Sequence, residues 1–195
     1  MELFGFDVEL SEEVYVPRED TYTIVEALEE EIVGGDRVID VGTGSGVLSF
    51  VASRHAKEVV GVDISKKAVD LARKNAAKNG IDNTTFFRSD LFENVEGEFD
   101  LVVFNAPYLP KDSRDENIEG SEMWSGENGG LDIVDRFLAR VKTHLSKEGR
   151  ILFLVSSLTG MEKVEESLLE REFSWEIVRE KKIPWETLYV VKAWL

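Results

Sequence analysis

The sequence contains no cysteine and only two histidines, His55 and His144. The absence of cysteine excludes disulfide bonds and cysteine-ligated metal sites, and two histidines so far apart in the chain do not indicate another kind of metal site. No apolar run approaches the ~20 residues that a membrane helix needs, and residues 1–7 lack the basic start and apolar stretch of a secretory signal. We therefore expect a cytoplasmic protein that binds neither a membrane nor a metal.

Positive charge is also scarce, with 23 lysines and arginines against 39 acidic residues and a formal net charge of −16. This excess repels nucleic acid unless basic side chains gather on one face. The candidate clusters are the cations between Lys66 and Lys78, more simply explained as the solvated face of a helix, and the pair Lys181-Lys182. The charge balance favours a small molecule or a basic protein as partner.

The length of 195 residues and an apolar content of 43% fit one domain of ordinary size with a sizeable core. Residues 1–36 are expected to form an N-terminal segment with one helix, which Asp20 or Thr23 would cap and which would end near Glu31. Residues 37–195 are expected to form the sheet core.

From Arg37 onward, short β-branched runs alternate with amphipathic stretches, which predicts βαβ crossovers and a largely parallel sheet. The expected strands are residues 37–41, 58–63, 84–88, 99–104, 151–155, 175–183 and 188–194, and the expected helices are residues 47–55, 65–79, 131–145 and 161–171. The last two strands follow each other through Pro184, which predicts an antiparallel hairpin at the end of the sheet. The long irregular stretch 109–130 follows a strand end and is expected to be a substrate-facing loop.

The sharpest motif is the glycine-rich turn Asp40-Val41-Gly42-Thr43-Gly44-Ser45-Gly46 between an expected strand and helix. Glycines there permit a tight turn and a close approach of the backbone to a ligand, although turn chemistry alone could explain them. The spacing is G-x-G-x-G, not the G-x-G-x-x-G of dinucleotide sites. Asp63 ends the next strand, where an acid can accept hydrogen bonds from both ribose hydroxyls; alone, it could equally cap the following helix.

A second acidic position, Asp90, follows the third expected strand. Its carboxylate could accept the exocyclic amine of an adenine, with Leu91 against the ring. The alternative is an ordinary turn aspartate, which is common at such places. We favour the adenine role because the position repeats the arrangement of an acid at a strand end.

The fourth strand is followed by Asn105-Ala106-Pro107-Tyr108. Pro107 forces Ala106 toward an extended backbone, so the Asn105 side-chain oxygen and the Ala106 carbonyl can converge on one NH2 group. Tyr108 offers a flat wall for a planar substrate. An isolated motif of this kind is more often a turn, but at the end of this strand it indicates an active site with Asn105, Ala106, Pro107 and Tyr108 as its catalytic residues.

These motifs resemble the HemK-type glutamine methyltransferases, and the short archaeal and eukaryotic release-factor methyltransferases most of all. The resemblance is carried by residues 16–21 (Val-Pro-Arg-Glu-Asp-Thr), the glycine turn, the segment after the fourth strand, and residues 124–126, Gly130 and 134–138. It spans nearly the whole chain. One departure is Ala106, which replaces the first proline of the family's N-P-P-Y motif; it keeps the carbonyl but loses rigidity and a ring contact.

The resemblance implies an α/β fold: a Rossmann-like, seven-stranded class I methyltransferase sheet, mostly parallel with its last strand antiparallel and with helices on both faces. It also implies S-adenosylmethionine as cofactor. The expected cofactor-binding residues are Thr21, Asp40, Gly42, Thr43, Gly44, Asp63, Ile64, Asp90, Leu91 and Asn105.

The implied reaction is methylation of a planar amide or amino nitrogen, with the glutamine of the Gly-Gly-Gln loop of a translation release factor as the leading substrate. An adenine or other nucleic-acid amino group is the alternative, because the same acceptors suit both. A third hypothesis is a cofactor-binding scaffold without activity, for which Ala106 is the only indication.

The resemblance further implies a small zinc-binding activator protein as partner. The strand at residues 84–88 would be a sheet edge in this fold, and an unpaired edge with Phe86 and Phe87 could take up a strand of another protein. The alternative, which the sequence leaves equally open, is that both phenylalanines pack under flanking helices.

Overall fold

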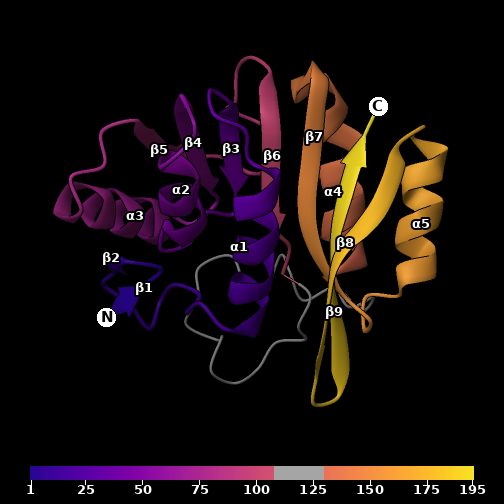
Figure 1. Ribbon diagram of the computed structural model, residues 1–195, viewed down its shortest axis with the longest axis horizontal. Coiled ribbons are helices and arrows are strands. Elements are labelled where there is room, and N and C mark those ends of the chain that lie inside the picture. The colour runs from indigo at the N-terminus through magenta and orange to yellow at the C-terminus, as the bar shows by residue number, and fades with distance from the viewer. Residues whose placement is uncertain (108–129) are drawn as a thin grey trace.

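The computed structural model describes residues 1–107 and 130–195, and its central feature is a sheet of seven strands (Figure 1). The strand order is β5-β4-β3-β6-β7-β9-β8. The bounds are β3 Arg37–Val41, β4 Glu58–Asp63, β5 Thr84–Arg88, β6 Phe99–Asn105, β7 Leu145–Ser156, β8 Ser174–Ile183 and β9 Glu186–Trp194. The pairings from β5 to β7 are parallel, whereas β9 is antiparallel to both of its neighbours. The predicted sheet and its closing hairpin are therefore confirmed.

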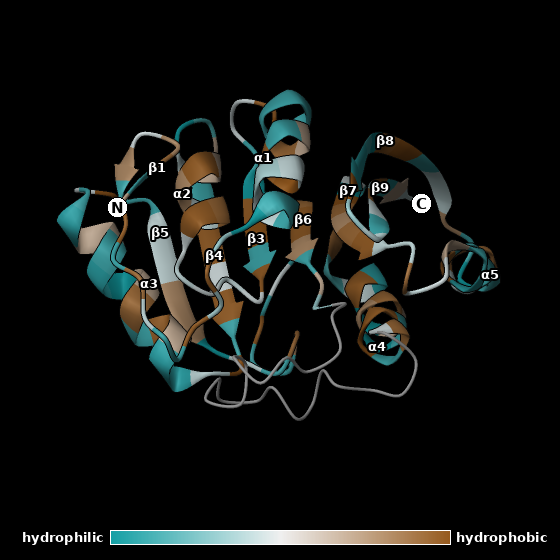
Figure 2. Ribbon diagram, turned by 90° about the horizontal axis from the view of Figure 1, so that it is seen from below, coloured by the Kyte–Doolittle hydropathy of each residue, from teal (hydrophilic) through white to brown (hydrophobic). Residues whose placement is uncertain are grey.

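Helices cover both faces of this sheet, as predicted (Figure 2). Helices α1 (Glu19–Glu31) and α2 (Val47–Ser53) pack on one face, and α4 (Leu131–Val141) and α5 (Met161–Glu170) pack on the other. Helix α3 (Lys66–Lys78) lies beside the edge strand β5. Alternate residues of each central strand enter opposite cores, so Val38 joins the cluster under α1 and Ile39 the cluster under α4. Burial on both faces explains why these strands are continuous apolar runs.

Several expected boundaries are wrong. Helix α1 begins one residue before Asp20, its N-cap is Arg18, and neither Asp20 nor Thr23 caps it. The expected helix 131–145 ends at Val141 and continues as a 3-10 turn, Lys142–His144, and β7 begins at Leu145 rather than at residue 151. Sequence reasoning also missed a small antiparallel pair, β1 (Glu2–Leu3) and β2 (Phe6–Asp7).

Strand β5 is an edge of the sheet, as expected, and its two phenylalanines point to opposite faces. Phe86 is buried and packs edge-on against Phe50 of α2, with ring centroids 6.2 Å apart. Phe87 is half-buried against the larger core. Phe86 therefore packs under the flanking helices, as the alternative expectation had it, and its carbonyl accepts hydrogen bonds from Arg73 of α3.

No helix in residues 1–107 and 130–195 is long and apolar enough to cross a membrane. Within the same ranges, the acidic and histidine side chains form no group of three or more that could hold a metal ion. The expected substrate-facing loop 109–130 falls, apart from Gly130, outside the described residues.

We expect Gly61→Ala to destabilise the fold. A Cβ atom there would lie 2.4 Å from the Phe86 ring and 2.9 Å from the Thr43 hydroxyl. Overpacking of this kind costs about 1–3 kcal/mol, which urea denaturation would measure. Gly34→Ala is the matched control, because its Cβ would meet nothing within 4 Å; equal stabilities of the two variants would contradict the packing described here.

Candidate active site

Apart from Thr21 on α1, the predicted site residues lie at or just after the carboxyl ends of four neighbouring parallel strands, β5, β4, β3 and β6. Parallel sheets bind ligands at this end. The glycine turn follows β3, Asp63 ends β4, Asp90 follows β5 and Asn105 ends β6. The fold therefore brings together four segments that are well separated in the sequence.

The turn after β3 requires its glycines. Gly42, Gly44 and Gly46 all have positive φ angles, of 69°, 55° and 92°, a region that residues with a side chain seldom adopt. A Cβ at Gly46 would also lie 2.4 Å from the ring of Phe50. The turn leads directly into α2, and its own backbone is held by hydrogen bonds from the Thr43 N–H to the Val62 carbonyl and from the Gly46 N–H to the Thr43 carbonyl, both at 2.9 Å.

Asp40 is the most deeply buried acid of the site, with 1% of its surface exposed. Its Oδ2 atom accepts hydrogen bonds from the Thr43 hydroxyl at 2.7 Å, and from the backbone and the hydroxyl of Ser49 at 3.1 and 2.7 Å. Its Oδ1 atom is buried without a partner in the described chain. Burial raises the pKa of this carboxyl to about 6, and the Ser49 and Thr43 hydrogen bonds oppose that rise.

Asp63 connects β4 to the glycine turn. Its Oδ2 atom accepts the Gly44 N–H at 2.9 Å, and its Oδ1 atom accepts the Ser65 N–H at 2.9 Å. Ser65, in turn, caps α3 through Ala68. Ser65 rather than Asp63 is therefore the cap of this helix. The Asp63 carboxylate is instead held against the glycine turn by its bond from Gly44.

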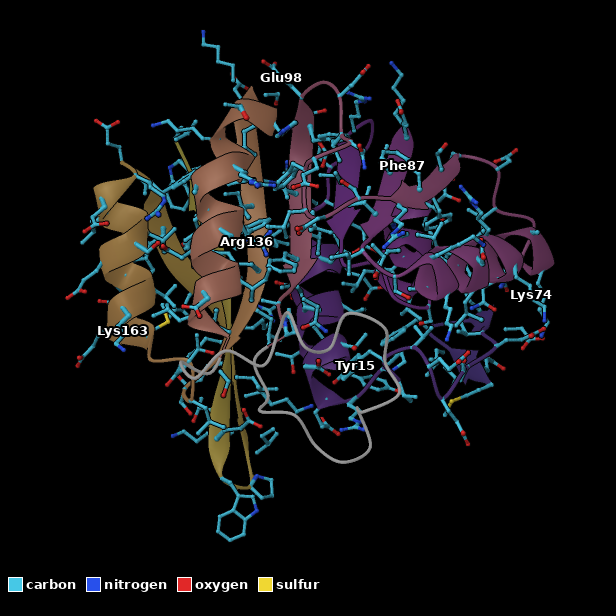
Figure 3. All side chains as sticks on the ribbon, turned by 180° about the vertical axis from the view of Figure 1, so that it is seen from behind. Tyr15, Lys74, Phe87, Glu98, Arg136 and Lys163 are labelled. Atoms are coloured by element: carbon cyan, nitrogen blue, oxygen red, sulfur yellow. The ribbon has the colours of Figure 1, made fainter. Side chains whose placement is uncertain are left out.

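Asp90 forms an ion pair that the sequence did not suggest. Its Oδ2 atom accepts a hydrogen bond from Arg136 of α4 at 2.7 Å, and Figure 3 labels this arginine. The next residue, Leu91, is buried with a φ of 50°, a strained conformation for a leucine. Such strain tends to occur at binding sites, and here it sets Leu91 directly beside the acid.

Asn105 is held by another side chain that sequence analysis assigned wrongly. Its Nδ2 group donates to Asp20 Oδ2 at 2.9 Å, and Tyr15 donates to the same oxygen at 2.9 Å. Asp20 is 3% exposed. Because the amide nitrogen faces Asp20, the amide oxygen faces away from it, and that Oδ1 atom is buried without a partner in the described chain. Asp20 thus acts on Asn105 from 85 residues away instead of capping α1.

The remaining predicted residues lie around this arrangement. Ala106 is buried and Pro107 is half-buried directly after Asn105, and Thr21 is buried on α1 next to Asp20. Ile64 follows Asp63, and its carbonyl accepts a hydrogen bond from Arg88 at 2.7 Å. Tyr108 and residues 124–126 of the resemblance lie outside the described residues. The contributions of Tyr15, Ser49 and Arg136 were missed, because no local pattern marks a partner from a distant element.

The strand order, the antiparallel β9 and the glycine turn between β3 and α2 define the class I methyltransferase fold, whose members use S-adenosylmethionine. A family model described as methyltransferase small domain matches residues 19–183. The chain belongs to this family of methyltransferases.

Individual relatives agree with that assignment. A protein of Methanocaldococcus jannaschii, whose name assigns it provisionally as a protein N5-glutamine methyltransferase, is 41% identical over 197 residues, with 100% of this chain and 98% of that protein covered. The release factor glutamine methyltransferase of Agrobacterium fabrum is 35% identical over 143 residues; the match covers 67% of this chain but only 50% of that protein.

A solved structure is similar over most of the chain as well. The E. cuniculi Mtq2–Trm112 complex, responsible for methylation of the eRF1 translation termination factor, is 30% identical, with a TM-score of 0.72. The match covers 93% of this chain and 98% of that one.

Asp40 gives a prediction about pH. Its pKa rises from 3.8 to about 6 on folding, so its contribution to stability is fully present below pH 4 and is lost as the pH rises through 6. A shift of about two units corresponds to roughly 3 kcal/mol. We expect Asp40→Asn, which cannot ionise, to gain up to that much stability relative to the wild type between pH 4 and 7. Urea unfolding of both proteins across this range measures the difference, and a difference that does not change with pH would refute the prediction.

Asp20 gives a second prediction, for methyl-transfer turnover. Asp20→Ala removes the acceptor that orients the Asn105 amide, and misplacement of a reacting group by about 1 Å can lower the rate on the order of 100-fold. We expect a fall of that order in kcat with a cofactor Kd within a few fold of the wild type. Tyr15→Phe removes the other donor to the same carboxylate and should change kcat far less. Equal losses in the two variants would assign Asp20 a purely structural role.

Proposed function

We propose that this protein transfers a methyl group from S-adenosylmethionine to the side-chain amide nitrogen of the glutamine in the Gly-Gly-Gln loop of a translation release factor. The carrying observation is the Oδ1 atom of Asn105, which is buried without a partner among the described residues and is oriented by Asp20, with Ala106 next in the chain. A buried acceptor without a hydrogen bond costs about 1–3 kcal/mol. A substrate NH2 group would remove that cost.

The residues fit the cofactor in three respects. The Asp40 Oδ1 atom, which has no partner among the described residues, suits a cationic amino group. Gly42 and Gly44 carry no side chain that could block close contact. Acids lie at or just after the ends of the neighbouring strands β4 and β5. We assign the amino acid end of the cofactor to Asp40 and the glycine turn, the ribose to Asp63, and the adenine to Asp90 and Leu91. The complete proposed set is Thr21, Asp40, Gly42, Thr43, Gly44, Asp63, Ile64, Asp90, Leu91 and Asn105.

The bound cofactor supplies an electrophilic methyl group on a sulfonium sulfur. The protein's task is to present a nucleophile, and an amide nitrogen is a poor one because its lone pair is delocalised into the carbonyl. Asn105 Oδ1 and the Ala106 carbonyl would each accept one N–H bond and aim the nitrogen, and they would stabilise positive charge developing there. Positioning of this kind can lower a barrier by several kcal/mol, with roughly 7–11 as the upper range.

No histidine or other strong base is needed if the nitrogen gives up its proton after transfer. The two acceptors also give selectivity. A carboxylate or hydroxyl substrate has fewer N–H or O–H donors, so it would leave a buried acceptor unpaired. The site therefore favours planar NH2 groups over oxygen nucleophiles.

The surface charge favours a protein substrate over the nucleic-acid alternative. The cations of the candidate basic cluster on α3 are neutralised within the chain: Lys66 by Asp70, Lys67 by Glu13 and Lys74 by Glu9. With a net charge of −16, the surface offers little attraction to phosphates. A basic protein loop fits this surface better than tRNA or DNA.

We also propose that a small zinc-binding protein pairs with the β5 edge. A groove of about 340 Å³ runs between α3 and β5, with Arg73, Ile81 and Thr84 among its lining residues. The Thr84 hydroxyl in this groove is buried without a partner in the described chain. The Phe86 carbonyl on this strand already accepts hydrogen bonds from Arg73 at 3.0 and 2.5 Å, so an incoming strand would pair with the Thr84 hydroxyl and with other backbone groups of β5.

The central test is methylation with radiolabelled cofactor of an archaeal release factor, tRNA and DNA, each offered separately and with or without the zinc-binding protein. We expect label on the release factor, located by mass spectrometry on the Gly-Gly-Gln glutamine. Asn105→Ala should keep cofactor affinity within several fold but lower kcat on the order of 100-fold or more. A release factor with that glutamine changed to glutamate controls for the site. Label on nucleic acid alone, or full turnover by Asn105→Ala, would overturn the proposal.

A further inference from the structure

The hairpin of β8 and β9 extends past the rest of the sheet on the side of the active site (Figure 1). Ser156, the last residue of β7, pairs with Leu188 of β9, which pairs in turn with Lys181 of β8. Residues 182–187 therefore lie beyond the carboxyl end of β7. The last pair is Ile183 with Glu186, so Pro184 and Trp185 form the tip.

Trp185 is unusual in two ways. It is 96% exposed, although a large aromatic ring gains most from burial. Its φ angle is 81°, in the region that glycine or asparagine would occupy at this turn position. A strained residue of this kind costs about 1–3 kcal/mol. Neither feature contributes to the stability of the fold, so the indole at this position calls for a functional reason.

The distance to the active site limits what the indole can contact. Asn105 pairs with Leu154, and Leu154 with Val190. From Val190 to Trp185 is five residues, or roughly 17 Å along the strand, and two strand spacings of about 4.8 Å separate β6 from β9. Trp185 thus lies on the order of 20 Å from Asn105, too far to touch a side chain whose nitrogen is at Asn105.

The surroundings of the tip favour a protein as the ligand. Lys181 lies 2.5 Å from Glu19 and Lys182 lies 3.9 Å from Glu180, so both lysines that precede the tip have an acidic partner. A second exposed apolar residue, Leu158, follows β7. The adjacent Ser157 is bonded to Thr187 of the hairpin through its N–H at 2.8 Å. Tryptophan is enriched among the residues that carry most of the binding energy of protein interfaces, so an exposed indole at this tip suits a protein-binding anchor.

We propose that Trp185 anchors the folded body of the protein substrate while the methylated loop enters the site at Asn105, an inference that rests on the proposed function. The hairpin would then select an intact protein over a free peptide with the same loop sequence. Binding would hold the substrate at a second point, which lowers KM without touching the chemical step.

The test compares an intact archaeal release factor with a short Gly-Gly-Gln peptide as substrates. Trp185→Gly should raise KM for the intact factor about tenfold or more, as expected for the loss of an aromatic anchor. It should leave kcat, cofactor affinity and peptide methylation unchanged. Because glycine suits the turn, the variant should melt no lower than the wild type. Trp185→Phe should recover part of the affinity, and Leu169→Ala, at an exposed residue of α5, is the control and should change nothing.

Three outcomes would overturn the inference. An unchanged KM for the intact factor in Trp185→Gly would refute the anchor alone and leave the proposed function standing. An equal rise in KM for the short peptide would place Trp185 within the active site instead. No methylation of the intact factor by the wild type would remove the proposed function and this inference with it. If Trp185→Gly does not fold, Trp185→Asn, which also tolerates a positive φ, takes its place.

Discussion

Parallel pairing of β5, β4, β3 and β6 is the constraint on which the site depends. In a parallel sheet the carboxyl ends of all strands lie on the same side of the sheet. The acids and the amide that follow these strands therefore meet although the chain separates them widely. Because helices cover both faces of the sheet, a ligand can reach backbone and polar side chains at the carboxyl ends of the strands. The strand order alone therefore brings these functional groups together, whatever contacts they make with one another.

The sequence was sufficient for this framework. Strands 37–41, 58–63 and 84–88 are predicted to the residue, because a β-branched run between turn signals has few other solutions in a chain that alternates strands and helices. Boundaries that depend on tertiary contacts were less accessible. β7 begins six residues early because Leu145 pairs with Phe99 across an irregular register, and no periodicity announces such a pairing. Likewise, the glycine turn indicated a cofactor-binding loop, but the sequence did not indicate that burial would raise the pKa of Asp40.

The sequence did not reveal which distant side chains hold each predicted residue in place through hydrogen bonds or ion pairs. Asp20 looked like a helix cap because it stands near the start of an amphipathic stretch, yet its carboxylate reaches across to Asn105. Arg136 entered the sequence analysis only as part of the segment 134–138, without a partner, yet it pairs with Asp90. Both partners come from other elements, so only the packed fold reveals them. They decide which way the reactive groups face, which residue identity alone leaves open.

These hydrogen-bonding partners explain how the site can hold buried polar atoms that have no partner among the described residues. A buried oxygen without a partner would normally draw its side chain into another rotamer or admit water. At Asn105 the rotation is blocked, because turning the amide would give up the bond to Asp20 and set two acceptor oxygens against each other. At Asp40 the three hydrogen bonds to one oxygen fix the other in the same way. Hydrogen bonds to neighbouring groups thus fix two acceptor oxygens that have no partner among the described residues, and in the proposed reaction this preorganisation would favour a ligand amino group at Asp40 and a substrate NH2 group at Asn105.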